Sequence, residues 1–188
     1  MCQFISGIAV KNGEAVTIYT LPREDSHTAI RAHFDIRDDG GPGASRQTPV
    51  ELVPVRGFER VEEYDFIFDD GRPDWWTDEM TETAKRELFR AARARWDGKS
   101  LAMGRDVYLG RLTSLAEGVS LKAGGNLGLG SLTSLPKGVS LTSGRDVYLG
   151  RLTSIGRGCQ LSAPAIYAAG AWHESSRKAR AAIKAKGE

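Results

Sequence analysis

Apolar positions recur with a period of twenty residues over the last third of the chain. Aligned on glycine, residues 104–123, 124–143 and 144–163 are three versions of one unit, and the phrase GRDVYLGRLTS occurs unchanged in the first and third. GKSLAM at 98–103 matches the end of a preceding unit. Self-similarity of this kind is typical of a solenoid, in which each unit covers the apolar face of its neighbour.

The alternation inside one unit predicts which side chains form the core. Val107 and Leu109 alternate with Asp106 and Tyr108, which is the pattern of a strand with one buried face. A helix is disfavoured because glycine recurs every few residues. Successive coils should lie ~4.8 Å apart, with matching leucines stacked as ladders. These ladders are Leu109, Leu129 and Leu149; Leu112, Leu132 and Leu152; and Leu121, Leu141 and Leu161.

The phrase LTSLPKG at 132–138 resembles the short leucine-rich repeats of bacterial effector proteins. The unit lacks the asparagine that usually follows the strand in those repeats, and Gly110, Gly130 and Gly150 lie near that place. A regular horseshoe and a tighter β-solenoid therefore remain alternatives.

The first 96 residues have mixed patterns and predict a small α/β domain. Residues 3–20 form a hairpin with its turn at 11–14, Asp25 or Ser26 caps a short helix that ends near Phe34, and 78–96 is a helix with apolar residues at four-residue spacing. Residues 38–49 are expected as a loop, and 50–55 and 64–68 as strands.

We therefore predict an α+β protein with three parts. Residues 1–96 form the N-terminal domain, 97–162 form a leucine-rich-repeat-like β-solenoid of about three coils, and 163–188 form a helical cap with a basic tail. The apolar stripe of the 78–96 helix is expected to cover the first coil, since the ends of a solenoid need covering.

Three short motifs carry a resemblance. MCQFIS at 1–6, Asp25-Ser26-His27 and Pro73-Asp74-Trp75 are similar to uncharacterised bacteriophage and prophage proteins. In those proteins a small N-terminal domain precedes pentapeptide or leucine-rich-like coils. The resemblance implies an accessory protein of a phage or mobile element that acts in the bacterial cytoplasm, and it implies no particular activity.

The composition indicates the cellular compartment that we expect and shows an uneven distribution of charge along the chain. The chain is 40% apolar and 27% charged, has a net charge of +2, and has no apolar run long enough to cross a bilayer and no export signal. The two cysteines, Cys2 and Cys159, favour reduced thiols rather than a disulfide framework. Residues 59–82 are acidic, whereas the chain from Lys85 onward is mostly basic.

The outward residues of the coils are the candidate partner-binding surface. They are Asp106, Tyr108 and Arg111 in the first coil, Asn126 in the second, and Asp146, Tyr148 and Arg151 in the third. Two tyrosines with only Gly128 between them predict a shallow slot with aromatic walls, and Tyr and Arg are enriched where proteins dock. We therefore expect a non-catalytic module that binds and inhibits a host or defence protein; alternatively, the tyrosines only cover the strand surface.

Nucleic-acid binding is a second hypothesis. Seven basic residues lie on the coils, and the two tyrosines offer stacking surfaces for bases. Asp106 and Asp146 lie in the same strands, however, and favour local ion pairs instead. The seven are Arg105, Arg111, Lys122, Lys137, Arg145, Arg151 and Arg157.

A small enzyme is the third hypothesis. Cys2 would act as an N-terminal nucleophile, assisted by His27 or Asp25; alternatively it is a buried small side chain. His27, His33 and His173 have no metal-ligand spacing, and the acidic run 65–74 is expected to be a solvated face. No metal and no cofactor are therefore expected.

Overall fold

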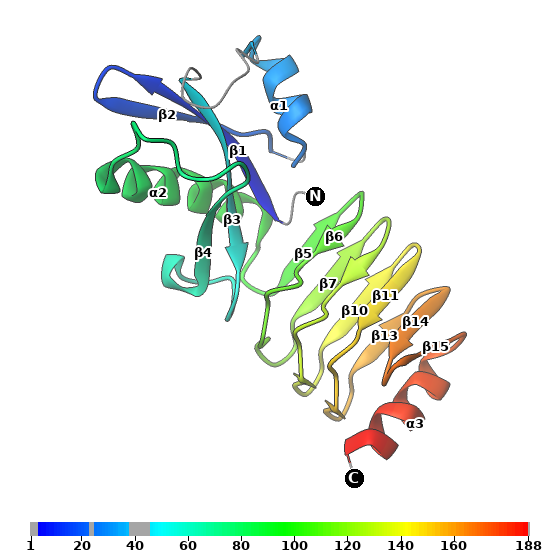
Figure 1. The fold of residues 1–188 in the computed structure, drawn as a ribbon. Coiled ribbons are helices and arrows are strands. Elements are labelled where there is room, and N and C mark those ends of the chain that lie inside the picture. Colours follow the sequence, from blue (N-terminus) through cyan, green and yellow to red (C-terminus); the bar gives the residue numbers. More distant parts are fainter. Residues whose placement is uncertain (1–3, 23–24, 38–45, 188) are drawn as a thin grey trace. The chain divides into compact units, whose positions relative to one another are not determined.

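The computed structural model describes residues 4–22, 25–37 and 46–187, which belong to two compact units (Figure 1). The first unit comprises Met1–Val53 and Tyr64–Arg95, and the second comprises Pro54–Glu63 and Trp96–Glu188. Residues 54–63, which the sequence patterns place inside the N-terminal range, therefore join the second unit. None of the helices in the described part of the chain is long and apolar enough to cross a membrane.

A four-stranded sheet in the order β2-β1-β3-β4 forms the centre of the first unit. The predicted hairpin is confirmed, with its turn at Gly13, whose positive φ of 62° suits glycine. The third strand begins at Gln47, earlier than expected, because residues 47–49 pair with β1. The strands are β1 (Ile5–Asn12), β2 (Ala15–Tyr19), β3 (Gln47–Pro54) and β4 (Tyr64–Phe68).

Two helices accompany this sheet. Ser26 caps α1 (His27–His33) by accepting a hydrogen bond from the backbone of Ala29 at 3.3 Å, as the sequence predicted. The long helix α2 (Asp78–Arg95) packs its buried stripe against β1 and β2, where Gly7 leaves room for Leu88. The part of the stripe from Met80 to Ala92 therefore packs within the first unit, whereas Trp96, which the sequence placed at the end of the stripe, belongs to the second unit.

The second unit contains a three-turn β-solenoid over residues 100–168. The coils are confirmed as the period predicted, but they continue past the expected end at residue 162, because β14 adds a further parallel strand to one sheet. Its two main sheets have the orders β13-β10-β7-β5 and β15-β14-β11-β8-β6, and every pairing is parallel except β14 with β15. Strands form both faces of the coil, and no helix interrupts residues 100–168, so the tighter β-solenoid is the form adopted.

The ladders keep the register that the repeat predicts. Leu101, Leu121, Leu141 and Leu161 pair in sequence across one sheet, and all four are buried. The strands are β5 (Ser100–Met103), β6 (Val107–Tyr108), β7 (Ser120–Ala123), β8 (Leu127–Gly128), β9 (Ser134–Leu135), β10 (Ser140–Ser143), β11 (Asp146–Leu149), β12 (Ser154–Ile155), β13 (Gln160–Ser162), β14 (Ala165–Ala168) and β15 (Ala171–His173).

Residues 54–63 cover the first coil. The ring of Phe58 stacks on Trp96 with centroids 4.7 Å apart, and the Trp96 indole donates a hydrogen bond to Glu59 at 2.6 Å. Thr113 donates its backbone N–H and its hydroxyl to the carbonyl of Val55. The segment includes the short 3-10 helix η1 (Val61–Glu63), after which the chain returns to the first unit as β4.

A helix covers the other end, as predicted. Ala179 and Ile183 of α3 (Ser176–Gly187) are buried, and the helix packs on strands β12 to β15. Arg180 donates a hydrogen bond to the backbone carbonyl of Cys159. The apolar ends of the coil stack are thus covered by segments that are not coils themselves.

Candidate functional site

One sheet of the solenoid brings its outward aromatic residues into a line. The strand register pairs Tyr108 with Gly128, Gly128 with Tyr148, Tyr148 with Tyr167, and Tyr167 with Trp172. These five residues, here called the aromatic row, occupy one position on five neighbouring strands. The row is longer than the pair of tyrosines that the sequence predicted.

Trp172 is the most exposed part of the aromatic row. Its side chain is 52% exposed, although its ring contacts Tyr148 and Tyr167 edge to face, with centroids 5.2 and 5.4 Å away. A two-residue turn at Ala169 and Gly170, both with positive φ, connects β14 to β15 and sets the position of the indole. The indole is therefore held by two rings and by the hairpin while about half of it faces solvent.

Sequence reasoning missed Tyr167 and Trp172. Tyr167 is nineteen residues after Tyr148 rather than twenty, because the last coil is one residue shorter than the others. An alignment on a strict period therefore stops before β14. The alternation of Ile166 with Tyr167 is the signal that would have extended the row.

The predicted slot between the two tyrosines is partly filled. The ring of Tyr108 lies against Gly128 so closely that a Cβ there would be 2.8 Å from Tyr108 Cδ1. Its hydroxyl donates to Asp106 at 3.3 Å. Desolvation, ahead of the nearby charge of Asp106, raises the pKa of Tyr108 despite an opposing hydrogen bond with Asn126. Tyr108 is thus a fixed, neutral side chain at neutral pH and covers the glycine.

The predicted polar residues Asp106, Asn126 and Asp146 connect one coil to the next. The backbone N–H of Asn126 donates to the Asp106 carboxylate at 2.6 Å, and the backbone N–H of Asp146 donates to the Asn126 side chain at 3.2 Å. This ladder satisfies backbone groups at the corner of the coil. A structural role therefore accounts for the side chains of Asp106 and Asn126, whereas Asp146 contributes its backbone N–H.

Basic residues follow two strands of the aromatic row in the sequence. Arg111 and Arg151 are exposed and occupy matching places after strands β6 and β11. Residues 96–188 carry 13 Lys and Arg against 6 Asp and Glu, whereas residues 1–95 carry 13 against 18. Residues 96–188, which comprise the solenoid and its C-terminal helix, are therefore the basic part of the molecule.

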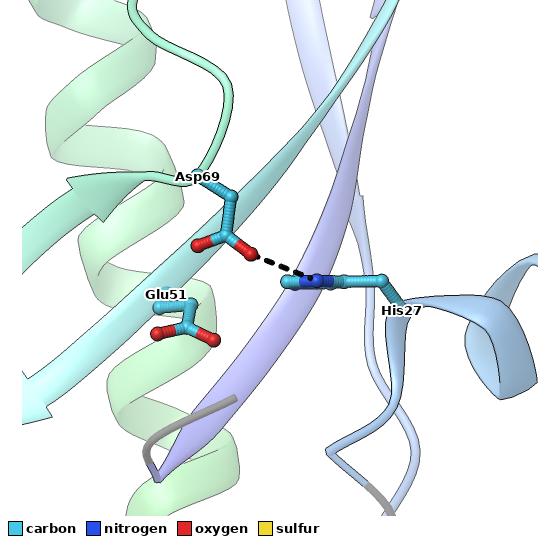
Figure 2. A group of neighbouring side chains, drawn as sticks. All are labelled: His27, Glu51 and Asp69. Atoms are coloured by element: carbon cyan, nitrogen blue, oxygen red, sulfur yellow. Dashed lines mark ion pairs between the residues drawn. The ribbon is translucent and has the colours of Figure 1, made fainter. Parts of the chain in front are cut away.

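A second group of functional side chains lies in the first unit. His27 opens α1, Glu51 lies in β3, and Asp69 directly follows β4; Figure 2 shows the two carboxylates facing the imidazole ring. His27 Nδ1 is 3.2 Å from Asp69 Oδ2, and one ligand atom from each of the three residues lies within 4.8 Å of the others. These residues are here called the His27 cluster.

The members of the His27 cluster differ in exposure. Glu51 is 2% exposed and accepts a hydrogen bond from Ser6 at 3.3 Å, which lies opposite it in the register of β1 and β3. The side chain of His27 is 11% exposed and that of Asp69 is 30% exposed. The cluster therefore runs from the interior of the sheet to the surface.

The structure places the remaining sequence candidates elsewhere. Cys2 lies outside the described residues. Asp25 forms an ion pair with Arg95 and so has a structural partner near the start of α1. His33 packs on Phe34, and His173 Nε2 lies 3.1 Å from the carbonyl of Ala168. Asp69 belongs to the acidic run that the sequence predicted to be a solvated face, and no spacing in the sequence connects it with His27.

Comparisons with protein-family models, with curated proteins and with solved structures find no match. What the two sites do must therefore be inferred from their geometry. The aromatic row offers a surface for a macromolecule, because it extends over five strands and includes a half-exposed indole. The His27 cluster offers nitrogen and oxygen donors for a cation.

Proposed function

We propose that this protein is a non-catalytic binding protein whose solenoid docks on a protein partner through the aromatic row. The observation that supports this proposal is the half-exposed Trp172, held between Tyr148 and Tyr167. Trp and Tyr are the residues most enriched among those that dominate binding energy at protein interfaces. A soluble domain gains no stability from leaving an indole half in water.

The rigidity of the row favours tight binding. Trp172 lies on a short hairpin strand, and its ring is already oriented by two tyrosines. Binding therefore loses little side-chain entropy, which otherwise lowers affinity by ~0.5–1.5 kcal/mol for each side chain that becomes ordered. The solenoid acts as a preorganised platform.

The borders of the row suggest the chemistry of the partner. Arg111 and Arg151 are exposed and follow Tyr108 and Tyr148 by three residues, and residues 96–188 carry a formal net charge of +7. A partner surface with apolar side chains surrounded by carboxylates would complement this face. If the resemblance to phage proteins holds, the partner is a bacterial host or defence protein whose activity is inhibited by the contact.

The experiment is capture from a bacterial lysate, identification of the retained protein, and titration of that purified partner. Replacing Trp172 by Ala should weaken binding about tenfold or more, because it removes the central anchor. Phe34→Ala is the matched control, since Phe34 is an exposed aromatic residue of the first unit. Equal affinity of both variants and the wild type would contradict the proposal, provided that circular dichroism shows both to be folded.

The basic excess of residues 96–188 also supports nucleic-acid binding as a second candidate. The two candidates respond differently to salt, because each phosphate contact releases counterions and makes affinity fall steeply with salt concentration. Titration of single-stranded DNA and RNA at two salt concentrations distinguishes them. Micromolar binding that disappears with salt and depends on Arg111 and Arg151 would favour nucleic acid over a protein partner.

A further inference from the structure

We propose that His27, Glu51 and Asp69 bind a divalent transition-metal ion such as Zn²⁺ or Mn²⁺. The site lies in the first unit and is independent of the binding function proposed for the solenoid. Three residues far apart in the sequence contribute one nitrogen and two carboxylate groups to it.

The distances suit a first-row metal ion. Bonds from zinc to nitrogen and oxygen are about 2.0–2.2 Å long, so neighbouring ligand atoms on one ion lie about 3.0–3.6 Å apart. The separation of 3.2 Å between His27 Nδ1 and Asp69 Oδ2 falls in this range. All three donor atoms lie within 4.8 Å of one another, and rotation of the carboxylates shortens the longer separations.

The contacts of the imidazole ring are compatible with coordination of an ion through Nδ1. Its Nε2 lies 3.4 Å from the carbonyl oxygen of Val50, and its Nδ1 faces the Asp69 carboxylate. A neutral imidazole has one N–H, so it can donate to only one of these two acceptors. When Nε2–H donates to Val50, the lone pair of Nδ1 points at a carboxylate, and a cation between them turns this repulsion into coordination.

The same hydrogen bond is the usual support of a metal-binding histidine. Such a histidine donates its other N–H to a backbone carbonyl or a carboxylate, which fixes the tautomer and the orientation of the ring. Val50 supplies that carbonyl from the strand that also carries Glu51. Ser6 donates to the Glu51 carboxylate, which is the corresponding support of an oxygen ligand.

The burial of Glu51 adds a second reason. A carboxylate that is 2% exposed has lost nearly all its hydration, and such a charge is stable only where it is paired, hydrogen-bonded or bound to a metal. Ser6 donates one hydrogen bond to Glu51, and a divalent ion would in addition offset the charges of Glu51 and Asp69 together. The pair of carboxylates therefore matches an ion of charge +2.

Hydrogen bonds and an ion pair fix the positions of the segments that carry the His27 cluster. Arg95 forms an ion pair with Asp25, two residues before His27, and also donates to the backbone carbonyls of Phe4, Leu21 and Pro22. These contacts hold the start of α1 beside the sheet. Asp69 is fixed by its own N–H, which donates to the carbonyl of Pro49 at 3.3 Å.

The donor set selects the class of metal. Mg²⁺ and Ca²⁺ prefer sites built only of oxygen, whereas imidazole together with carboxylates suits zinc and manganese. Three protein ligands leave at least one position of the ion for water. Magnesium should therefore bind much more weakly than zinc.

The test uses the full chain, freed of metal with a chelator and titrated with ZnCl₂, MnCl₂ and MgCl₂ by calorimetry. We expect one equivalent of zinc, a higher Tm in its presence, and reversal by the chelator. Asp69→Asn and His27→Ala should each weaken zinc binding about 100-fold or more, because the first removes the charge of a ligand and the second removes a ligand altogether. Asp70→Asn is the matched control, since Asp70 is the exposed acidic neighbour outside the cluster.

Two results would overturn the proposal. One is the absence of saturable zinc or manganese binding by the wild-type chain. The other is zinc binding that survives both Asp69→Asn and His27→Ala, which would place the ion elsewhere. If His27→Ala does not fold, nitrogen NMR of the wild type replaces it, since zinc must shift Nδ1 of His27 more than Nε2.

Discussion

In the solenoid, residues that contact each other across coils are about twenty positions apart in the sequence. In the first unit, the sequence separation of contacting residues follows no repeated pattern. The carboxylate of Asp106 meets the backbone of Asn126 twenty residues later, and this contact recurs in the next coil. In the first unit Arg95 reaches Asp25 over 70 residues, and Ser6 reaches Glu51 over 45. Each of these long-range contacts occurs once.

The difference determines how each candidate site arises. The aromatic row forms by addition, because every coil places one residue at the same point of the sheet. The His27 cluster forms by convergence of a helix start, a strand centre and a strand end. The loss of stability caused by removing a repeated contact should therefore depend on which coil contains it. Removing a unique contact should destabilise the whole first unit.

The largest effect is expected at Arg95. Its side chain is 4% exposed, and Arg95→Met would leave Asp25 and three backbone carbonyls without their donor. Breaking a buried ion pair typically destabilises a protein by about 3–5 kcal/mol. Denaturant unfolding followed by circular dichroism measures this loss.

Two further variants sharpen the result at Arg95. Arg95→Lys should recover only part of the loss, because an ammonium group cannot reach all the acceptors of a guanidinium fork. Asp25→Asn should be less harmful in the Arg95→Met background than alone. A loss below about 1 kcal/mol for Arg95→Met would show that the unit does not depend on this unique contact.

Glycines at one corner of the coil test the graded behaviour. A Cβ at Gly144 would lie 2.1 Å from the carbonyl oxygen of Gly124, whereas a Cβ at Gly104, the same position of the first coil, meets nothing within 4 Å. Gly144→Ala should therefore destabilise the solenoid by about 1–3 kcal/mol or more, because backbone must move. Gly104→Ala should be neutral or stabilising by less than about 1 kcal/mol. Equal effects in thermal unfolding would contradict the stacking of these corners.

The smallest effect concerns the turn that starts the first coil. Asp97 accepts hydrogen bonds from the Ser100 hydroxyl and from the backbone N–H groups of Lys99 and Ser100. These hydrogen bonds lower the pKa of Asp97, and the bond from the Ser100 hydroxyl has the largest effect. Because the pKa is lower when folded than when unfolded, the stabilisation is present at neutral pH. It is lost as the pH falls through the folded-state value.

An NMR titration of the carboxyl carbon measures this shift. Ser100→Ala should move the midpoint of Asp97 upward, toward its ordinary range, whereas Ser120→Ala should leave it unchanged. The positions equivalent to Asp97 in later coils are Glu117, Lys137 and Arg157. Each of these follows a coil, whereas Asp97 precedes the first coil. A midpoint that Ser100→Ala does not move would contradict the assigned cause.

Elements with local signals could be predicted from the sequence. The hairpin at Gly13, the Ser26 cap, the strand Tyr64–Phe68 and the helix from Asp78 each depend on neighbours within a few residues. The coils were predictable because the repeat makes distant contacts appear as a period. Both results follow from information that is visible along the chain.

The remaining features depend on long-range contacts that no sequence pattern indicates. Residues 54–63 cover the first coil because Phe58 finds Trp96, 38 positions away. Glu51 is buried although its type favours the surface, since its strand brings it opposite Ser6 and beside His27. Sheet order decides these neighbours, and a single sequence does not reveal the order β2-β1-β3-β4.

The constant register of the solenoid has a consequence for its dimensions. A stretch of twenty residues in the regular coils, such as 124–143, begins and ends at equivalent points of the coil. Duplicating or deleting it would return the chain to the same phase and change the length of the stack by ~4.8 Å. The length of the solenoid is thus set by the number of coils. The distance between Tyr108 and Trp172 can therefore be changed by adding or removing a coil, without redesigning the core.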